Sequence, residues 1–197
     1  MSNDLYKAPE SNIDSMTEED KTFYVVSIQK FTLLFFATMG LYSVYWFYKN
    51  WALYKIAYSA DVWPIPRGIF SIFFAHRLYG AIDAELKTRE IQYQWNPDML
   101  ATGYVIITIF SHVMDRLAEA GRFMPMAEYL SFLMIPVVYW LLYKVQLAIN
   151  VVEGDVKGQY NNRYTGLNIF WIGLGLFLWS GIVLMVLDEV GVDILPV

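Results

Sequence analysis

The residues best suited to chemistry in this chain lie at regular spacing within one apolar stretch, residues 97–120. On a helix, with 100° per residue, the polar side chains of this stretch fall within an arc of about 100°. They are Tyr104, Thr108, Ser111, His112, Asp115 and Glu119, here called the polar stripe. His112 and Asp115, three residues apart, could share a proton, and ionisable groups in a membrane segment usually face protein or water. The polar stripe therefore predicts a path for protons or ions, or else ordinary solvation and bonding near a helix end.

Other catalytic chemistry has little support in the sequence. The chain has no cysteine, which excludes disulfides and thiol catalysis. Its two histidines, His76 and His112, are predicted near opposite membrane faces, which argues against a shared metal or haem. No glycine-rich phosphate loop and no hydrolase motif is present. We therefore expect no enzymatic activity, no cofactor and no metal site.

The elements that must position the stripe are long and apolar. Of 197 residues, 57% are hydrophobic and only 17% are charged, fewer than in a typical soluble domain. The net charge of −5 gives no indication of nucleic-acid binding. Four segments match the length needed to cross a bilayer, at about residues 28–52, 97–120, 126–150 and 168–187. The fold prediction is an all-α membrane protein with four transmembrane helices, and the alternative is a soluble protein with buried helices.

The chain outside these four helices divides into a tail and one further helix. Residues 1–22 read as a mobile polar tail, and residues 23–197 as a single transmembrane helical domain. Between the first two spans, the apolar residues of segment 67–90 recur at three- and four-residue steps. This pattern predicts an interfacial amphipathic helix, or a re-entrant turn, or a helix packed on the bundle. Its bases Arg67, Arg77 and Lys87 are candidates for binding lipid headgroups.

The distribution of lysine and arginine predicts the sidedness of the chain. With four spans, nine of the fourteen bases fall on the side of the 53–96 and 151–167 connections, and five fall on the other side. Because the more basic side is usually cytoplasmic, both termini are predicted to lie outside the cytoplasm.

The first predicted span has features of a packing surface. Small residues recur every three positions at Ala37, Gly40 and Ser43, a spacing that lets another helix approach closely or that arises by chance. Tyr45 and Trp46 follow as aromatic contact residues. We take these five as candidate partner and packing residues.

The same segment, TMGLYSVYWFYKNW, resembles a T-x-G-[IL]-Y-x-x-Y-W-[FY]-Y-[KR] signature of small multi-pass bacterial inner-membrane proteins of uncharacterised function. The matching residues are Thr38, Gly40, Leu41, Tyr42, Tyr45, Trp46, Phe47, Tyr48 and Lys49. The resemblance implies a multi-pass fold in the bacterial inner membrane and carries no chemistry.

Together these features favour a non-enzymatic accessory or scaffolding subunit of an inner-membrane assembly. Its expected partners are the lipid bilayer and other membrane protein subunits, in a homo- or hetero-oligomer. One alternative is a small oligomeric transporter or channel that uses the polar stripe. Another is a lipid-interacting protein that uses the basic residues of segment 67–90.

Overall fold

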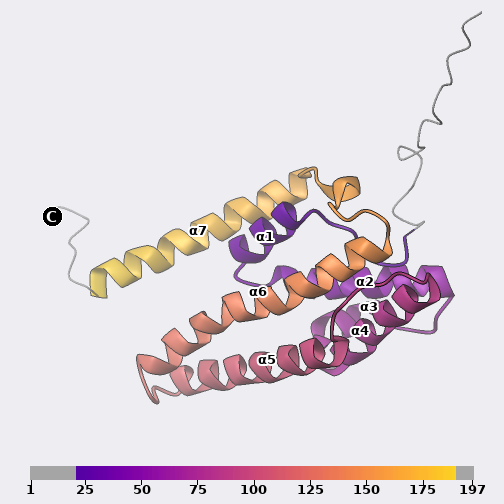
Figure 1. Cartoon of the computed structure of the whole chain (residues 1–197). Helices are drawn as coiled ribbons and strands as arrows, with labels where there is room; N and C mark the ends of the chain where they lie inside the picture. Colours follow the sequence, from indigo (N-terminus) through magenta and orange to yellow (C-terminus); the bar gives the residue numbers. More distant parts are fainter. Residues whose placement is uncertain (1–20, 190–197) are drawn as a thin grey trace, which may run out of the picture.

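A computed structural model describes residues 21–189 of the chain, so residues 1–20 of the predicted tail lie outside the described part. The described part is all helical, as the sequence predicts, and has no strand. The elements are α1 (Ile28–Ala37), α2 (Tyr42–Tyr58), α3 (Pro64–Ile69), α4 (Ser71–Thr88), α5 (Pro97–Glu119), α6 (Met126–Val152), η3 (Gln159–Asn161) and α7 (Gly166–Glu189). Figure 1 shows α5 beside α6, and α7 beside α1.

Three helices are long and apolar enough to cross a membrane. They are Pro97–Glu119, Met126–Val152 and the Gly166–Leu184 part of α7. They match three of the four predicted spans within a few residues, and they indicate a membrane protein. Asn96 caps α5, because its side chain accepts a hydrogen bond from Met99 N at 2.9 Å.

The fourth predicted span, residues 28–52, is not one helix. The chain turns at residues 38–41, where Met39 and Gly40 take positive φ angles of 52° and 85°. Thr38 Oγ1 links the two sides of the turn, since it donates to Leu34 O at 2.8 Å and accepts from Tyr42 N at 3.0 Å. The ten residues of α1 rise about 15 Å, roughly half of a hydrocarbon core.

Helices α1 and α2 form a hairpin instead of a span. The ring of Phe31 in α1 lies 5.8 Å from that of Tyr42 and 6.3 Å from that of Trp46, so α2 folds back beside α1. We call α1–α2 the first hairpin and residues 38–41 its tip. Segment 28–52 therefore forms a shorter helical hairpin, and the described chain has three candidate spans where the sequence predicted four.

Segment 64–88 forms a second hairpin, with α3 and α4 joined at Phe70. The helix predicted at 67–90 is thus interrupted near its start. Gly68 packs α3 against α2 so closely that a Cβ atom would lie 2.9 Å from Val44 O. Helix α4 buries one face, formed by Ser71, Ala75, Leu78, Tyr79, Ile82 and Leu86, but Ile69, Phe70 and Phe73 of the predicted apolar pattern are exposed. Helix α4 packs on α5, and the exposed His76 lies with its Nε2 3.0 Å from Thr102 Oγ1.

Helix α7 contacts the rest of the chain at few points. Gly175 lies against the backbone of Ala37, where any Cβ atom would overlap the Ala37 carbonyl. One turn further along, Trp179 Nε1 donates to Phe36 O at 2.8 Å. Most large side chains of α7 are exposed, which suits a helix surrounded by lipid.

The extended segment before α1, residues 21–27, is buried in the centre of the fold. Asn150 bonds both backbone groups of Val26, accepting from its N at 3.4 Å and donating to its O at 3.0 Å. Gln146 Nε2 donates to Tyr24 O at 3.1 Å, and Asn50 Oδ1 accepts from Tyr24 N at 3.0 Å. Side chains of two helices, α2 and α6, thus replace the neighbouring strand that an extended backbone normally requires.

Two further groups complete this arrangement. Glu153 Oε1 accepts from Thr22 N at 3.1 Å and from Phe23 N at 2.9 Å. Trp46 Nε1 donates to Gln146 Oε1 at 2.5 Å, which joins the first hairpin to α6. Because a buried backbone group without a partner is costly, these side chains fix the position of segment 21–27.

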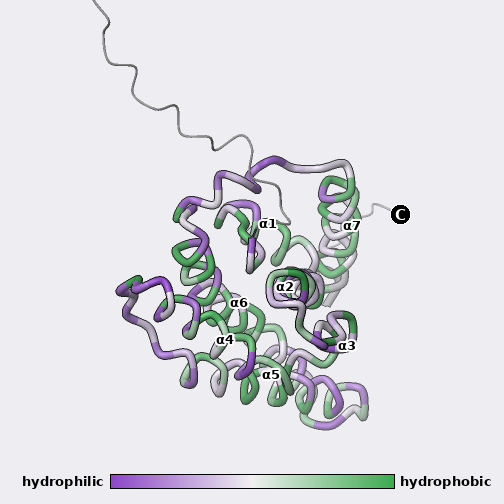
Figure 2. The backbone as a smooth tube through the Cα atoms, turned by 90° about the vertical axis from the view of Figure 1, so that its right-hand side faces the viewer, coloured by the Kyte–Doolittle hydropathy of each residue, from purple (hydrophilic) through white to green (hydrophobic). Residues whose placement is uncertain are grey.

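The same contacts place the start of the described chain beside the end of α6. Lys21 Nζ donates to Glu153 O at 3.2 Å, and Arg89 Nη1 donates to Val152 O at 2.8 Å. The four-span topology placed Lys21 and Glu153 on opposite membrane faces, so it does not fit this geometry. Figure 2 views the molecule from this end, with α2 near the middle and hydrophilic stretches in the connections between helices.

Candidate functional site

The polar stripe lines one cavity, which we call the stripe cavity. Its volume is about 930 Å³, and it lies between α5, α6 and the turns of both hairpins. All six residues of the polar stripe are in its lining. The first hairpin contributes its tip, and the second contributes Phe70 and Ser71. The structure therefore brings the sequence-predicted stripe together with two turns that the sequence did not predict.

The exposure of the polar stripe to solvent changes along α5. Tyr104 is buried at the end near the hairpins, with its hydroxyl 2.7 Å from Ser71 Oγ. Asp115 and Glu119 are exposed at the other end. Tyr104 and Asp115 are about 16 Å apart along the helix axis, at 1.5 Å per residue. The cavity thus leads from exposed carboxylates to buried hydroxyl groups.

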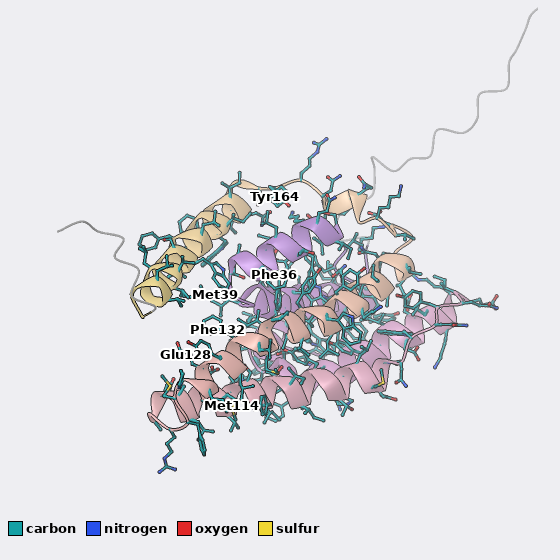
Figure 3. All side chains as sticks on the ribbon, turned by 60° about the vertical axis from the view of Figure 1, so that its left-hand side comes forward. Phe36, Met39, Met114, Glu128, Phe132 and Tyr164 are labelled. Atoms are coloured by element: carbon teal, nitrogen blue, oxygen red, sulfur yellow. The ribbon has the colours of Figure 1, made fainter. Side chains whose placement is uncertain are left out.

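Helix α6 supplies polar groups that the sequence analysis missed. Ser131 Oγ donates to the carboxylate of Asp115 and lies 3.1 Å from Ser111 Oγ. Glu128, one turn earlier on the same face, also lines the cavity. In Figure 3, Glu128 and Phe132 lie on the part of α6 that extends past Met39 at the first hairpin's tip. The three-residue spacing of Glu128 and Ser131 is the signal that could have identified this face.

The charged groups of the stripe cavity are mainly acidic. Asp115, Glu119 and Glu128 carry carboxylates, and His112 is the one ionisable nitrogen among the lining residues. Arg116 forms an ion pair with Glu119 at 2.9 Å, but their side chains are 82% and 64% exposed, so the pair contributes little. An acidic cavity attracts protons, cations and hydrogen-bond donors.

Beyond Tyr104 the cavity is closed by packed aromatic residues. The Phe47 ring lies 5.3 Å from that of Tyr104 and 6.4 Å from that of Tyr79. Phe47, Tyr79 and Trp46 are completely buried. The stripe cavity therefore has access from one end of the molecule, the end at which α5 connects to α6.

The predicted packing residues have separate environments, because the helix that was to align them is broken. Ala37 contacts Gly175 of α7, Gly40 forms the tip, and Ser43 lines the stripe cavity. Trp46 is buried in its bond to Gln146, whereas Tyr45 is 43% exposed. In the described chain these five residues share no single packing face, although the Ala37 contact is a close helix approach. Their contact with a partner protein stays a prediction.

Of the three predicted headgroup residues, Arg67 and Arg77 lie close enough for their charges to repel, whereas Lys87 lies in the last turn of α4. The Arg67 guanidinium stacks on the rings of Trp51, at 4.2 Å, and Phe74, at 5.0 Å. Lys87 forms an ion pair with Asp83 at 2.6 Å, one turn away on α4. Arg77 is exposed on α4. Their lipid contact stays a prediction, with Arg67 already engaged by aromatic rings.

Comparisons with protein-family models, with curated proteins and with solved structures find no match to this chain.

Proposed function

We propose that this protein is a small membrane transporter in which the stripe cavity receives protons or cations from one side of the membrane. The observation that carries this proposal is the cavity itself, a space of about 930 Å³ beside two candidate spanning helices, which all six residues of the polar stripe line. Ionisable groups at such a position are costly unless water or a ligand reaches them.

The residues of the cavity divide into an entrance and a floor. Asp115 and Glu119 concentrate cations at the entrance, and His112 offers an imidazole nitrogen there. Tyr104 and Ser71 offer hydroxyl ligands at the floor. Passage further requires the hairpin tips to move, and the left-handed residues Met39 and Gly40 place a turn at that point.

Proton uptake into liposomes tests this proposal. The purified protein is reconstituted with a pH-sensitive dye inside, and a potassium diffusion potential drives uptake. Asp115→Asn and His112→Ala should each lower the rate about tenfold. Asp61→Asn removes an exposed carboxylate outside the cavity and should leave the rate unchanged. Uptake equal to that of protein-free liposomes, or equal in all variants, contradicts the proposal.

The proposed orientation has three spans, with both hairpins entering from one side. Of the thirteen lysines and arginines in residues 21–189, only Arg116 and Arg122 lie at the α5–α6 connection. The other eleven belong to the opposite side or to helix halves that lead to it. This asymmetry exceeds the nine-to-five ratio of the four-span topology, and it supports a non-cytoplasmic α5–α6 connection.

Reporter fusions test the orientation. An N-terminal fusion should be active in the cytoplasm, and a fusion after Val197 should be active only on the other side. Fusions that report the same side for both ends would contradict three spans, because such a topology requires an even number of spans.

An accessory role in an inner-membrane assembly is the second candidate. It is favoured by α7, whose close contact with the rest of the chain is centred on Gly175 and Trp179. An accessory subunit should co-purify with a partner in mild detergent and show no proton uptake of its own. A transporter should show uptake as the purified chain.

A further inference from the structure

A second cavity lies on the other side of the first hairpin, and we call it the lysine cavity. Its volume is about 630 Å³, and it is bounded by segment 21–27, α1, α2 and the start of α7. Leu41 of the hairpin tip lines both cavities, and the remaining lining residues differ. The lysine cavity is therefore a separate site, and it has no part in the proposed transport path.

Two buried lysines lie at the mouth of this cavity. Lys30 is 3% exposed, and its Nζ donates to Asn161 Oδ1 and to Arg163 O, both at 2.7 Å. Lys21 is 8% exposed, with Nζ bonded to Glu153 O and 5.9 Å from the Tyr160 ring centroid. Glu153 contacts Lys21 through its backbone oxygen, and its Oε1 accepts from two backbone N–H groups. The mouth thus holds two ammonium groups in fixed positions.

The deeper wall of the cavity is apolar and aromatic. Leu34 is one turn beyond Lys30 on α1, about 6 Å deeper, and Trp171 is five residues beyond Gly166, about 7.5 Å into α7. Leu167 and Leu41 also line this wall, and both are largely exposed. The lysines at the mouth of the cavity are therefore followed, within one or two helical turns, by an apolar wall.

The position of the cavity matches the boundary of a bilayer. Its mouth lies where the candidate span of α7 begins, next to Asn161 and Thr165 of the polar connection. Its apolar wall follows α7 into the span. This end of the molecule also carries most of the lysines and arginines, so the proposed orientation places it in the cytoplasm.

We propose that the lysine cavity binds an anionic phospholipid. The phosphate of the headgroup would take the place near Lys30 and Lys21, and one acyl chain would follow Leu34, Leu167 and Trp171. Basic pockets between transmembrane helices suit anionic headgroups, and each buried methylene of an acyl chain adds to the affinity. A soluble phosphate compound would match only the mouth of this cavity.

Binding to nanodiscs and native mass spectrometry test this proposal. The wild-type protein is compared in phosphatidylglycerol and in phosphatidylcholine, and bound lipid is counted after transfer to detergent. Phosphatidylglycerol should be retained preferentially. Lys30→Gln should weaken its retention about fivefold, and Lys30→Arg should largely restore it. Lys157→Gln removes an exposed base outside the cavity and should have no effect.

A second variant keeps the test valid if Lys30→Gln fails to fold. Leu167→Trp narrows the space beside the apolar wall of the cavity without a change of charge. It replaces a side chain that is 63% exposed. It should also weaken phosphatidylglycerol retention. Soluble glycerol phosphate should not displace the lipid, because it lacks the acyl chain. Equal retention of both lipids, unchanged retention in Lys30→Gln and Leu167→Trp, or full displacement by glycerol phosphate would overturn the proposal.

Discussion

Segment 21–27 and the stripe cavity differ in how the polar side chains around them are held. Around segment 21–27, nearly every polar side chain is committed to a backbone group, as Asn150 is to Val26. In the stripe cavity, His112, Asp115 and Glu119 are exposed. Bonded amides fix a backbone, whereas accessible ionisable groups can take up and release a ligand.

The same comparison applies to the asparagines of the chain. Asn50 and Asn150 are completely buried and bond to segment 21–27, whereas Asn162 is exposed and bonds to Gln159. Asn150 is 124 residues from its partner Val26, Asn50 is 26 residues from Tyr24, and Asn162 is 3 residues from Gln159. The role of an asparagine therefore depends on the segment that it contacts in the fold.

The largest predicted effect comes from breaking the bonded region. Asn150→Leu leaves the N–H and C=O groups of Val26 buried without that partner, at a cost of roughly 2–5 kcal/mol in the free energy of unfolding. Thermal or denaturant unfolding in detergent measures this loss. Asn162→Leu, at an exposed asparagine, should change stability little. Equal effects of the two variants would show that segment 21–27 is not held as described.

A smaller effect is expected at the contact between α1 and α7. Gly175→Leu places a side chain against the Ala37 carbonyl and should separate α7 from α1, with a loss of about 1–3 kcal/mol. Gly173→Leu, two residues away and with no atom within 4 Å of its added Cβ, is the matched control. Thermal unfolding measures the loss of stability, and a cysteine cross-link between α1 and α7 measures the separation of the two helices. A cross-link that survives in Gly175→Leu would contradict this packing.

The smallest effect is a dependence of stability on pH in the bonded region. Burial raises the pKa of the Glu153 carboxyl, and the N–H of Phe23 together with nearby Arg89 and Lys21 partly oppose this. Because the folded state then binds the proton more tightly than the unfolded state, this contribution is complete below the ordinary pKa of 4.5. It is lost as the pH rises through the raised pKa.

Melting curves of the wild type and Glu153→Gln check this sign. The amide retains an oxygen acceptor for Thr22 N and Phe23 N but cannot ionise. The melting temperature of the wild type should therefore fall more steeply than that of Glu153→Gln between pH 4.5 and about pH 7. Glu90→Gln, at an exposed glutamate, should keep the wild-type slope. Parallel slopes for the wild type and Glu153→Gln would refute the assignment.

Local patterns predicted much of the fold. The start of α5 follows from Asn96 and Pro97, and the apolar lengths of α5, α6 and α7 gave their approximate limits. The polar stripe followed from the helical period alone, because it requires only that residues 97–120 be one helix. All of its members line one cavity for that reason.

What the sequence could not predict depends on long-range contacts. The break in segment 28–52 contains no proline and no charge, and its one local signal is Gly40 with φ of 85°. The hairpin is held by hydrogen bonds to residues far along the chain. Trp179 Nε1 donates to Phe36 O, and Trp46 Nε1 donates to Gln146 Oε1. The four-span prediction is not confirmed for this reason, because α1 and α2 fold back beside each other and form no continuous candidate span.

The most direct test of the account is the accessibility of single cysteines, which the cysteine-free chain permits. Ser111→Cys lies in the stripe cavity, and Ser59→Cys lies at the exposed end of α2. A membrane-impermeant thiol reagent is applied to right-side-out and to inverted membrane vesicles. We predict that Ser111→Cys is labelled only from the outer face and Ser59→Cys only from the cytoplasmic face. Labelling of Ser111→Cys from the cytoplasmic face, or from neither face, would contradict a one-sided, water-accessible cavity.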